Sequence, residues 1–496
     1  MNTISSQNPF FETYSTLHST VPFDKIKTGD YVPAIREGIR RQNAEIEAII
    51  RNPEVPTFAN TVLAYEKSGE MLHRVSTVFG NLLSAETDDD LQELAKEIMP
   101  MMSEHENNIS LNEELFARIK AVYKQQDKET LSPEQHKLLE DIYNGFVRNG
   151  ANLLGEDKEK YRALCKELSL LTLQFSENNL KETNDYKLVI TDKSQLAGLP
   201  ESAVEAAAET AGEKGVEGWV FTLQAPSYGP FLTYADSRDL RRELYMAYNT
   251  KCTHDNASNN LEIVKKLANV RMEIAQLLGY DNFAEYNLQE RMAQNSESVY
   301  KLLDQLLEAY TPTAKQEYAE VQALARQAEG EDFVLMPWDW AYYSHKLKDR
   351  KFNIDDELLR PYFELNNVKQ GVFGLATRLY GITFKKNPDI PVYHKDVDAY
   401  EVFDKDGKFL AVFYTDFHPR AGKRSGAWMT SYKEQWIDEK TGENSRPHIS
   451  IVMNFTKPTQ DKPALLTFGE VETFLHEFGH SLHGMFANST YGSLSG

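Results

Sequence analysis

The sequence has 496 residues, with 54 Lys and Arg against 75 Asp and Glu and a formal net charge of −21. Its hydrophobic fraction of 41% and charged fraction of 26% are typical of a folded globular protein and exclude a disordered chain. The acidic balance argues against a nucleic-acid partner, because binding to phosphate groups needs an excess of Lys and Arg.

The sequence also bears on the cellular compartment. Cys165 and Cys252 are too few for a disulfide scaffold or a cysteine-rich metal site, which favours a reducing environment. The first 25 residues contain no apolar run of signal-peptide length, and no stretch approaches the ~18 consecutive apolar residues of a membrane span. We therefore expect a cytoplasmic monomer with no membrane contact, or a periplasmic one if a signal has been removed.

Helical patterns dominate the chain after a loose arm at 1–25. Apolar residues recur every three or four positions along 158–181 and along 263–277, and Gly279 is placed to end the second helix. The acidic run at 88–90 is interpreted as a helix start, where carboxylates suit the dipole, rather than as a cation site. The sequence thus predicts a mainly α protein.

Strand signals are few and grouped. Residues 187–191 and 218–223 predict one small sheet. A second sheet is predicted later in the chain, where 399–403 and 409–414 flank an Asp-Gly turn that is typical of a hairpin. Two further apolar runs, 426–432 and 448–455, are expected to extend that hairpin.

The most informative segment is TFGEVETFLHEFGHSLH, at 467–483. It contains H-E-x-x-H, formed by His476, Glu477 and His480. On a helix, residues four apart lie on one face, about 6 Å apart along the axis, so both imidazoles can bind one Zn²⁺. Glu477 lies at the edge of that face, where it can act as a base without being a ligand.

A chance match is the alternative, and the helical context opposes it. Thr467 and Glu470 fit a capping box that starts the helix. Gly479 in the helix interior costs about 1 kcal/mol relative to Ala, from which we expect a closely packed neighbour at that position.

A third zinc ligand is not evident after the motif. His483 lies about 10 Å along the helix from His476, too far for one tetrahedral metal, so it is interpreted as a packing residue or an outer contact of the site. The H-E-x-x-H-x-x-G-x-x-H pattern fails, because its last two defined positions hold His483 and Phe486. Residues 481–496 contain no Asp or Glu.

The segment HEFGHSLHGMF resembles the active-site helix of the thimet oligopeptidase family of zinc peptidases, and in particular its peptidyl-dipeptidase branch. The resemblance covers nearly the whole chain and includes the segments at 21–34, 53–72, 337–352, 360–368 and DFHPRAGKRSGAWMTSY at 416–432. It implies a mainly α, two-lobed zincin-type metallopeptidase with small β-sheets and a deep central channel.

The resemblance also assigns roles to the motif. It implies that His476 and His480 bind one Zn²⁺ and that Glu477 is the general base. The family's third ligand is a Glu after an S-L-S-G stretch, which here is 493–496, so that Glu is expected about nine residues past Gly496. We therefore expect that the C-terminal part is missing and that the 496-residue chain alone is inactive.

Further site assignments concern residues outside the motif. Gly426 and Ala427 resemble a strand that pairs with the peptide backbone in related enzymes, and an ordinary sheet strand is the equal alternative. Glu470 could orient a zinc histidine, although the capping box accounts for it as well. The segment Trp338-Asp339-Trp340 is interpreted as core packing with a helix cap rather than as a substrate contact.

The function implied is zinc-dependent hydrolysis of short peptides with release of C-terminal dipeptides. Internal cleavage of short peptides is the alternative, and a non-catalytic peptide-binding helical protein with an incomplete metal site is an alternative of another class. The expected organisation is an arm at 1–25, a helical region at 26–182, a small α/β region at 183–255 and an incomplete catalytic region at 256–496. The last region includes a sheet at 399–455 and the motif helix at 467–487.

Overall fold

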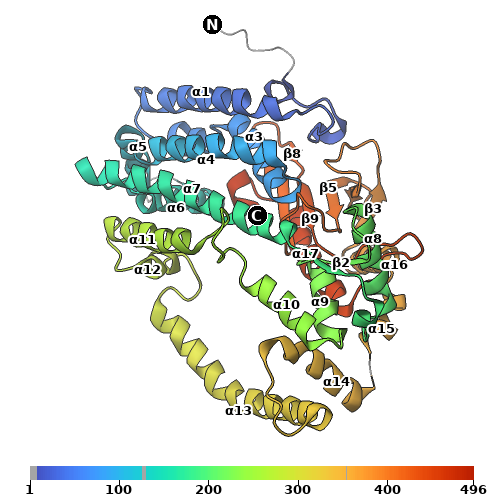
Figure 1. Ribbon diagram of the computed structural model, residues 1–496. Helices are drawn as coiled ribbons and strands as arrows, with labels where there is room; N and C mark the ends of the chain where they lie inside the picture. Colours follow the sequence, from blue (N-terminus) through green and yellow to red (C-terminus); the bar gives the residue numbers. More distant parts are fainter. Residues whose placement is uncertain (1–7, 126–129, 354) are drawn as a thin grey trace. The chain divides into compact units, whose positions relative to one another are not determined.

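A computed structural model describes residues 8–125, 130–353 and 355–496. The chain divides into two compact units (Figure 1). The first consists of Met1–Leu173, Lys369–Met453 and Glu472–Gly496, and the second of Gln174–Val368 and Asn454–Val471.

A five-stranded sheet forms the centre of the first unit. Its strands lie in the order β3 (Thr383–Lys386), β4 (Val397–Phe403), β5 (Phe409–Asp416), β9 (His448–Val452) and β6 (Trp428–Lys433). Strands β5 and β9 are parallel, and the other pairs are antiparallel. The predicted hairpin is β4–β5, closed by a turn in which Gly407 has φ +77°. Strands β9 and β6 extend it as predicted.

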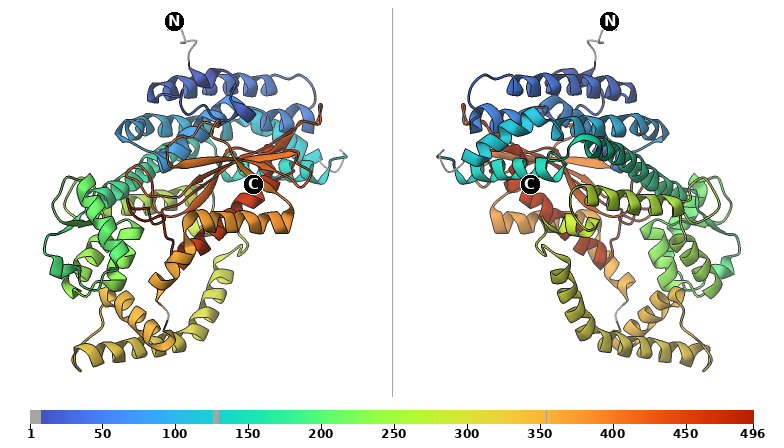
Figure 2. Two further views of the ribbon diagram at one scale, coloured as in Figure 1. Left: turned by 90° about the vertical axis from the view of Figure 1, so that its right-hand side faces the viewer. Right: turned by 90° about the vertical axis from the view of Figure 1, so that its left-hand side faces the viewer.

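Helices cover both faces of this sheet, with the blue N-terminal helices on one side and α16 and α17 on the other (Figure 2). On the first side, α1 (Tyr31–Ile50), α3 (Glu70–Ala85) and α4 (Asp89–Ser110) share a core with Val412 and Tyr414 of β5. On the second side, α16 (Leu365–Tyr380) and α17 (Phe468–Phe486) contribute aromatic rings that pack on Phe413. Helix α17 thus lies directly on the sheet.

The remaining elements of the first unit are short or helical. They are α2 (Leu63–Glu66), α5 (Glu113–Gln125), α6 (Pro133–Arg148), the first part of α7 (Gly155–Asp185), β7 (Trp436–Ile437) and β8 (Asn444–Ser445). Asp88 caps α4 through its side chain, which accepts a hydrogen bond from the Leu91 amide, so the predicted helix start is confirmed.

The second unit is mostly helical and contains the two-stranded sheet of β1 (Leu188–Ile190) and β2 (Trp219–Phe221), which was predicted. Its helices are α8 (Glu201–Glu213), α9 (Ala225–Tyr234), α10 (Arg238–Asn249), α11 (Leu261–Leu277), α12 (Phe283–Leu288), α13 (Ser296–Glu329), α14 (Trp340–Phe352) and α15 (Asp356–Leu359). Gly279, with φ +85°, follows the end of α11 as predicted.

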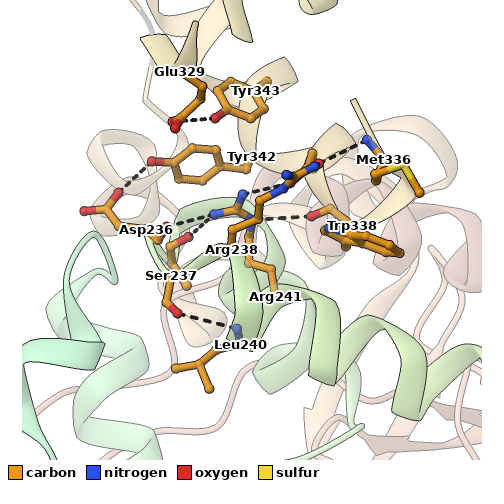
Figure 3. A network of polar contacts seen from close by, with 12 residues as sticks. Asp236, Ser237, Arg238, Leu240, Arg241, Glu329, Met336, Trp338, Tyr342 and Tyr343 are labelled. Carbon is orange, nitrogen blue, oxygen red and sulfur yellow. Dashed lines mark hydrogen bonds and ion pairs between the residues drawn. The ribbon is translucent and has the colours of Figure 1, made fainter. Parts of the chain in front are cut away.

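Asp339 joins α10 to the start of α14 in the second unit. Figure 3 shows Arg238 and Arg241 of α10 in the same network, together with Trp338, whose carbonyl accepts a hydrogen bond from Arg241. The Asp339 carboxylate has no exposed surface and accepts hydrogen bonds from Arg238 (2.6 Å) and Arg241 (3.0 Å). It also accepts one from the Met336 amide and so caps the short 3₁₀ turn Pro337–Asp339, whereas it makes no side-chain cap to α14. The prediction that Trp340 is a core residue is wrong, because its side chain is 41% exposed and stacks on α13.

The described part of the chain is mainly helical with small sheets, as the sequence predicts. Within that part, no helix combines the length and the apolar character that crossing a membrane requires.

Candidate metal centre

Helix α17 begins with the predicted capping box. The Thr467 amide donates to Glu470 Oε2 at 2.8 Å, and the Glu470 amide donates to Thr467 Oγ1 at 3.1 Å. These reciprocal bonds satisfy two amides that have no partner within the helix. The motif therefore starts two turns into a regular helix.

His476 and His480 lie together on the exposed face of α17. Their Nε2 atoms are 3.2 Å apart, and their ring centroids are 4.9 Å apart. Two nitrogens that bind one tetrahedral zinc at 2.0–2.1 Å are about 3.3–3.4 Å apart. The two side chains therefore fit a shared Zn²⁺ as they stand.

Glu477 lies on the buried face of α17, next to the exposed face that carries the two histidines. Its side chain is 8% exposed, and its neighbours Phe474 and Phe478 are buried against the aromatic side of the sheet. The Glu477 carbonyl accepts a hydrogen bond from Ser481 Oγ at 3.0 Å. Glu477 is thus packed more closely than the two histidines, which are exposed.

A third ligand does not accompany the histidine pair. Across residues 8–125, 130–353 and 355–496, no three or more His, Cys, Asp or Glu side chains are grouped to hold a metal ion. His483 is exposed on α17, but it does not complete such a group with the pair. The described residues therefore offer two protein ligands.

Glu470 contacts threonines. Besides Thr467, its carboxylate accepts hydrogen bonds from the Thr456 amide at 2.6 Å and from Thr456 Oγ1 at 3.0 Å. These contacts tie the start of α17 to the preceding segment and account for both carboxylate oxygens. They are separate from the exposed face that carries His476.

The closely packed glycine of α17 is Gly484, and the prediction for Gly479 is wrong. A Cβ atom on Gly479 would meet nothing within 4 Å, because this residue shares the exposed face with the histidines. A Cβ atom on Gly484 would lie 2.7 Å from Ile449 Cδ1 and 3.1 Å from Met429 Cε. The close approach is therefore between α17 and strands β9 and β6.

Gly426 and Ala427 directly precede β6, which is an edge strand of the five-stranded sheet. Gly426 is exposed and has φ +103°, a conformation that favours glycine. Along the strand itself, Asn81 Nδ2 of α3 donates to the Ser431 carbonyl at 2.8 Å. The middle of β6 is therefore bound to α3, whereas Gly426, just before the strand, is exposed.

A buried charged cluster, which the sequence patterns did not predict, lies at the end of β5. Asp416 has no exposed surface and accepts hydrogen bonds from Tyr393 (2.8 Å), from both terminal nitrogens of Arg420 (2.8 and 2.7 Å) and from Lys423 (2.6 Å). The only signal in the sequence is an acidic residue with two basic residues four and seven positions later.

Burial and neighbouring charges have opposite effects on the pKa values of Asp416 and Lys423. Burial lowers the pKa of Lys423 to about 8, although the neighbouring Asp416 carboxylate opposes that effect. Burial would raise the pKa of Asp416, but the hydrogen bond from Arg420 and the charge of Lys423 outweigh it and lower this pKa. Mutual contact thus keeps Asp416 ionised in the interior.

The chain is similar in sequence to several known peptidases. Dipeptidyl carboxypeptidase of Escherichia coli is 40% identical over 496 residues, which are 99% of this chain and 72% of that protein. Oligopeptidase A of the same organism is 34% identical over 479 residues, 96% of this chain and 70% of that protein. Among solved structures, PZ peptidase A with an inhibitor matches with a TM-score of 0.46 and 16% identity, covering 91% of this chain and 62% of that one. Residues 231–496, which include the histidine pair, match the description "Peptidase family M3", and the chain belongs to that family.

Proposed function

We propose that the chain carries the zinc-binding helix and general base of a peptidase that hydrolyses short peptides. The observation that carries the proposal is the 3.2 Å separation of His476 Nε2 and His480 Nε2, with Glu477, a buried residue, next to His476 in the helix. Membership of peptidase family M3 supports it.

His476 and His480 would hold one Zn²⁺ through their Nε2 atoms. When bound, the ion would polarise the scissile carbonyl and lower the pKa of an attacking water. Glu477 would take one proton from that water as its oxygen bonds to the carbonyl carbon. The same carboxyl group would then give the proton to the leaving amine nitrogen as the C–N bond breaks.

The third ligand would come from outside the described residues. A Glu is the ligand that the resemblance implies, and a carboxylate would offset part of the charge of Zn²⁺. Two imidazoles alone leave half of a tetrahedral shell to water. We therefore propose that the chain by itself holds zinc weakly and turns over peptides poorly.

The substrate would be an extended peptide that pairs with the start of edge strand β6, at Gly426 and Ala427. Backbone pairing of this kind binds peptides of many sequences. Release of C-terminal dipeptides is the proposed activity, and the name of the Escherichia coli dipeptidyl carboxypeptidase supports it. Cleavage of internal bonds is the second candidate, supported by the similar oligopeptidase A. A cytoplasmic monomer remains the proposed form.

A chimera tests the proposal. Fusing this chain to the part of the Escherichia coli dipeptidyl carboxypeptidase that it does not cover would supply the missing ligand. With zinc, the chimera is expected to shorten a hexapeptide by two C-terminal residues, which mass spectrometry detects. Internal fragments would favour the oligopeptidase activity. Binding of the peptide without any product, in a folded chimera that holds zinc, would support a non-catalytic binding protein instead.

A further inference from the structure

Residues 417–427 connect β5 to β6, and we call them the crossing loop. This irregular segment is fixed by hydrogen bonds on two sides. Its first anchor is Asp416, the last residue of β5, which binds Arg420 and Lys423 of the loop. Both carboxylate oxygens therefore accept bonds from the crossing loop.

Lys423 uses all of its donors inside the protein. Its Nζ donates to Asp416 Oδ1 at 2.6 Å, to the His418 carbonyl at 2.6 Å and to the Met453 carbonyl at 2.8 Å. The side chains of Lys423 and Asp416 have no exposed surface. A buried ion pair adds little stability compared with apolar residues of the same size, because both charges lose their hydration. Its advantage here is geometric, since three fixed acceptors allow one loop conformation.

The outer side of the crossing loop is bound to the last turn of α3 and to the connection that follows it. The Thr87 amide donates to the Gly422 carbonyl at 2.8 Å, and the Arg424 amide donates to the Ser84 carbonyl at 2.9 Å. A Cβ atom on Gly422 would lie 2.3 Å from the Thr87 carbonyl oxygen, so only glycine allows this approach. The loop is thus held on two sides.

Each end of the crossing loop leads to a part of the proposed site. At its start, the ring of Phe417 packs edge-on against Phe474 of α17, with centroids 5.0 Å apart. Both rings are buried, and Phe474 is two residues before His476. At its end, Gly426 and Ala427 lead into β6.

We propose that the Asp416–Lys423 ion pair is a positioning device for the candidate site. It holds the crossing loop so that Phe417 sets the position of the histidine-bearing helix while Gly426 and Ala427 present the edge strand. Lys423 and Asp416 act through the loop and touch neither metal nor substrate. The inference rests on the proposed function, which it deepens by linking the metal-binding helix to the peptide-binding strand.

Hydrogen exchange on the 496-residue chain tests this link without metal or activity. Lys423→Met is expected to raise amide exchange both in α17 and at 424–433, whereas Phe417→Ala raises it in α17 only. Ile119→Ala, in a separate core of the N-terminal helices, serves as a control with a comparable loss of melting temperature. Equal exchange patterns in the three variants would overturn the proposal. If Lys423→Met does not fold, the comparison of Phe417→Ala with Ile119→Ala decides alone.

A spectroscopic readout separates positioning from general stability. Cobalt(II) is titrated into the chain, and its visible absorption reports binding to the histidine pair. Phe417→Ala is expected to weaken cobalt binding by about tenfold, as loss of outer contacts does at other metal sites. Ile119→Ala is expected to leave it unchanged, and equal affinities in the two variants would overturn the proposal. Failure of the chimera to cleave peptides would instead refute the proposed function, and hydrogen exchange would still decide the positioning role.

Discussion

His476 Nε2 and His480 Nε2 lie 3.2 Å apart on the exposed face of α17, one turn of helix from each other. This separation is close to that of two ligands on one tetrahedral zinc, about 3.3–3.4 Å. The spacing follows from helix geometry, because residues four apart lie on one face of a helix. The pair therefore has the geometry of two ligands of one metal ion, as the proposed function requires.

The first prediction is that the pair acts as a unit toward metal. His480→Ala is expected to remove detectable cobalt(II) binding, because one imidazole holds the ion too weakly. His254→Ala, at an exposed position of the second unit, is the matched control and is expected to retain wild-type binding. Binding by His480→Ala with wild-type affinity would place the metal elsewhere.

The second prediction separates the base from the ligands. Glu477→Gln keeps the size of the side chain but removes the proton acceptor, so zinc affinity is expected to stay within about threefold while turnover by the chimera falls by roughly 10²–10⁴. Metal analysis and steady-state kinetics on the same samples measure both quantities. A variant that cleaves peptides at the wild-type rate would show that another group is the base.

The third prediction compares two glycines of α17. Gly479→Ala is expected to stabilise the protein by about 1 kcal/mol, because the site is open and alanine favours helix. Gly484→Val is expected to destabilise it by about 1–3 kcal/mol, because its side chain would overlap Ile449. Chemical denaturation measures both changes. Destabilisation by Gly479→Ala would mean that an unseen neighbour contacts that face.

The fourth prediction concerns acid stability. Burial, with the nearby charges of Lys433 and His18, lowers the pKa of His448 to about 3. Below its ordinary pKa the unfolded chain binds a proton that the folded chain does not. The free energy of unfolding should therefore fall as the pH falls from 6 to 4, by about 1.4 kcal/mol per pH unit from this group. In His448→Gln that part of the slope should disappear, whereas the exposed-site variant His254→Gln should keep it.

The fifth prediction concerns the buried aspartate of the second unit. Asp339→Ala leaves Arg241, which is 1% exposed, without its charged partner, and is expected to cost about 3–5 kcal/mol. Glu262→Ala breaks an exposed ion pair with Lys265 and is expected to cost far less, because both side chains are screened by water. Denaturant titrations compare the two. Equal losses would show that burial of Asp339 does not matter.

Much of the fold was predictable because it depends on neighbours in the sequence. The capping box of α17, the hairpin of β4 and β5 and the side-chain cap at Asp88 all join residues within a few positions. Strand β3 was missed, because its four residues alternate weakly and three of them are exposed. The exposed position of Trp340 was missed because its surroundings come from α13, about twenty residues earlier in the chain.

The sequence by itself determined the elements of the candidate site that lie within one helix: the spacing of His476 and His480 and the place of Glu477 beside them. Only the tertiary structure decided that Gly484, rather than Gly479, meets the sheet, and that Asp416 anchors a loop next to this helix. The physical reason is how far apart in the sequence the interacting residues lie. A helix places residues four apart by its own geometry, whereas the contacts of Lys423 with Met453 and of Phe417 with Phe474 exist only after distant segments have packed together.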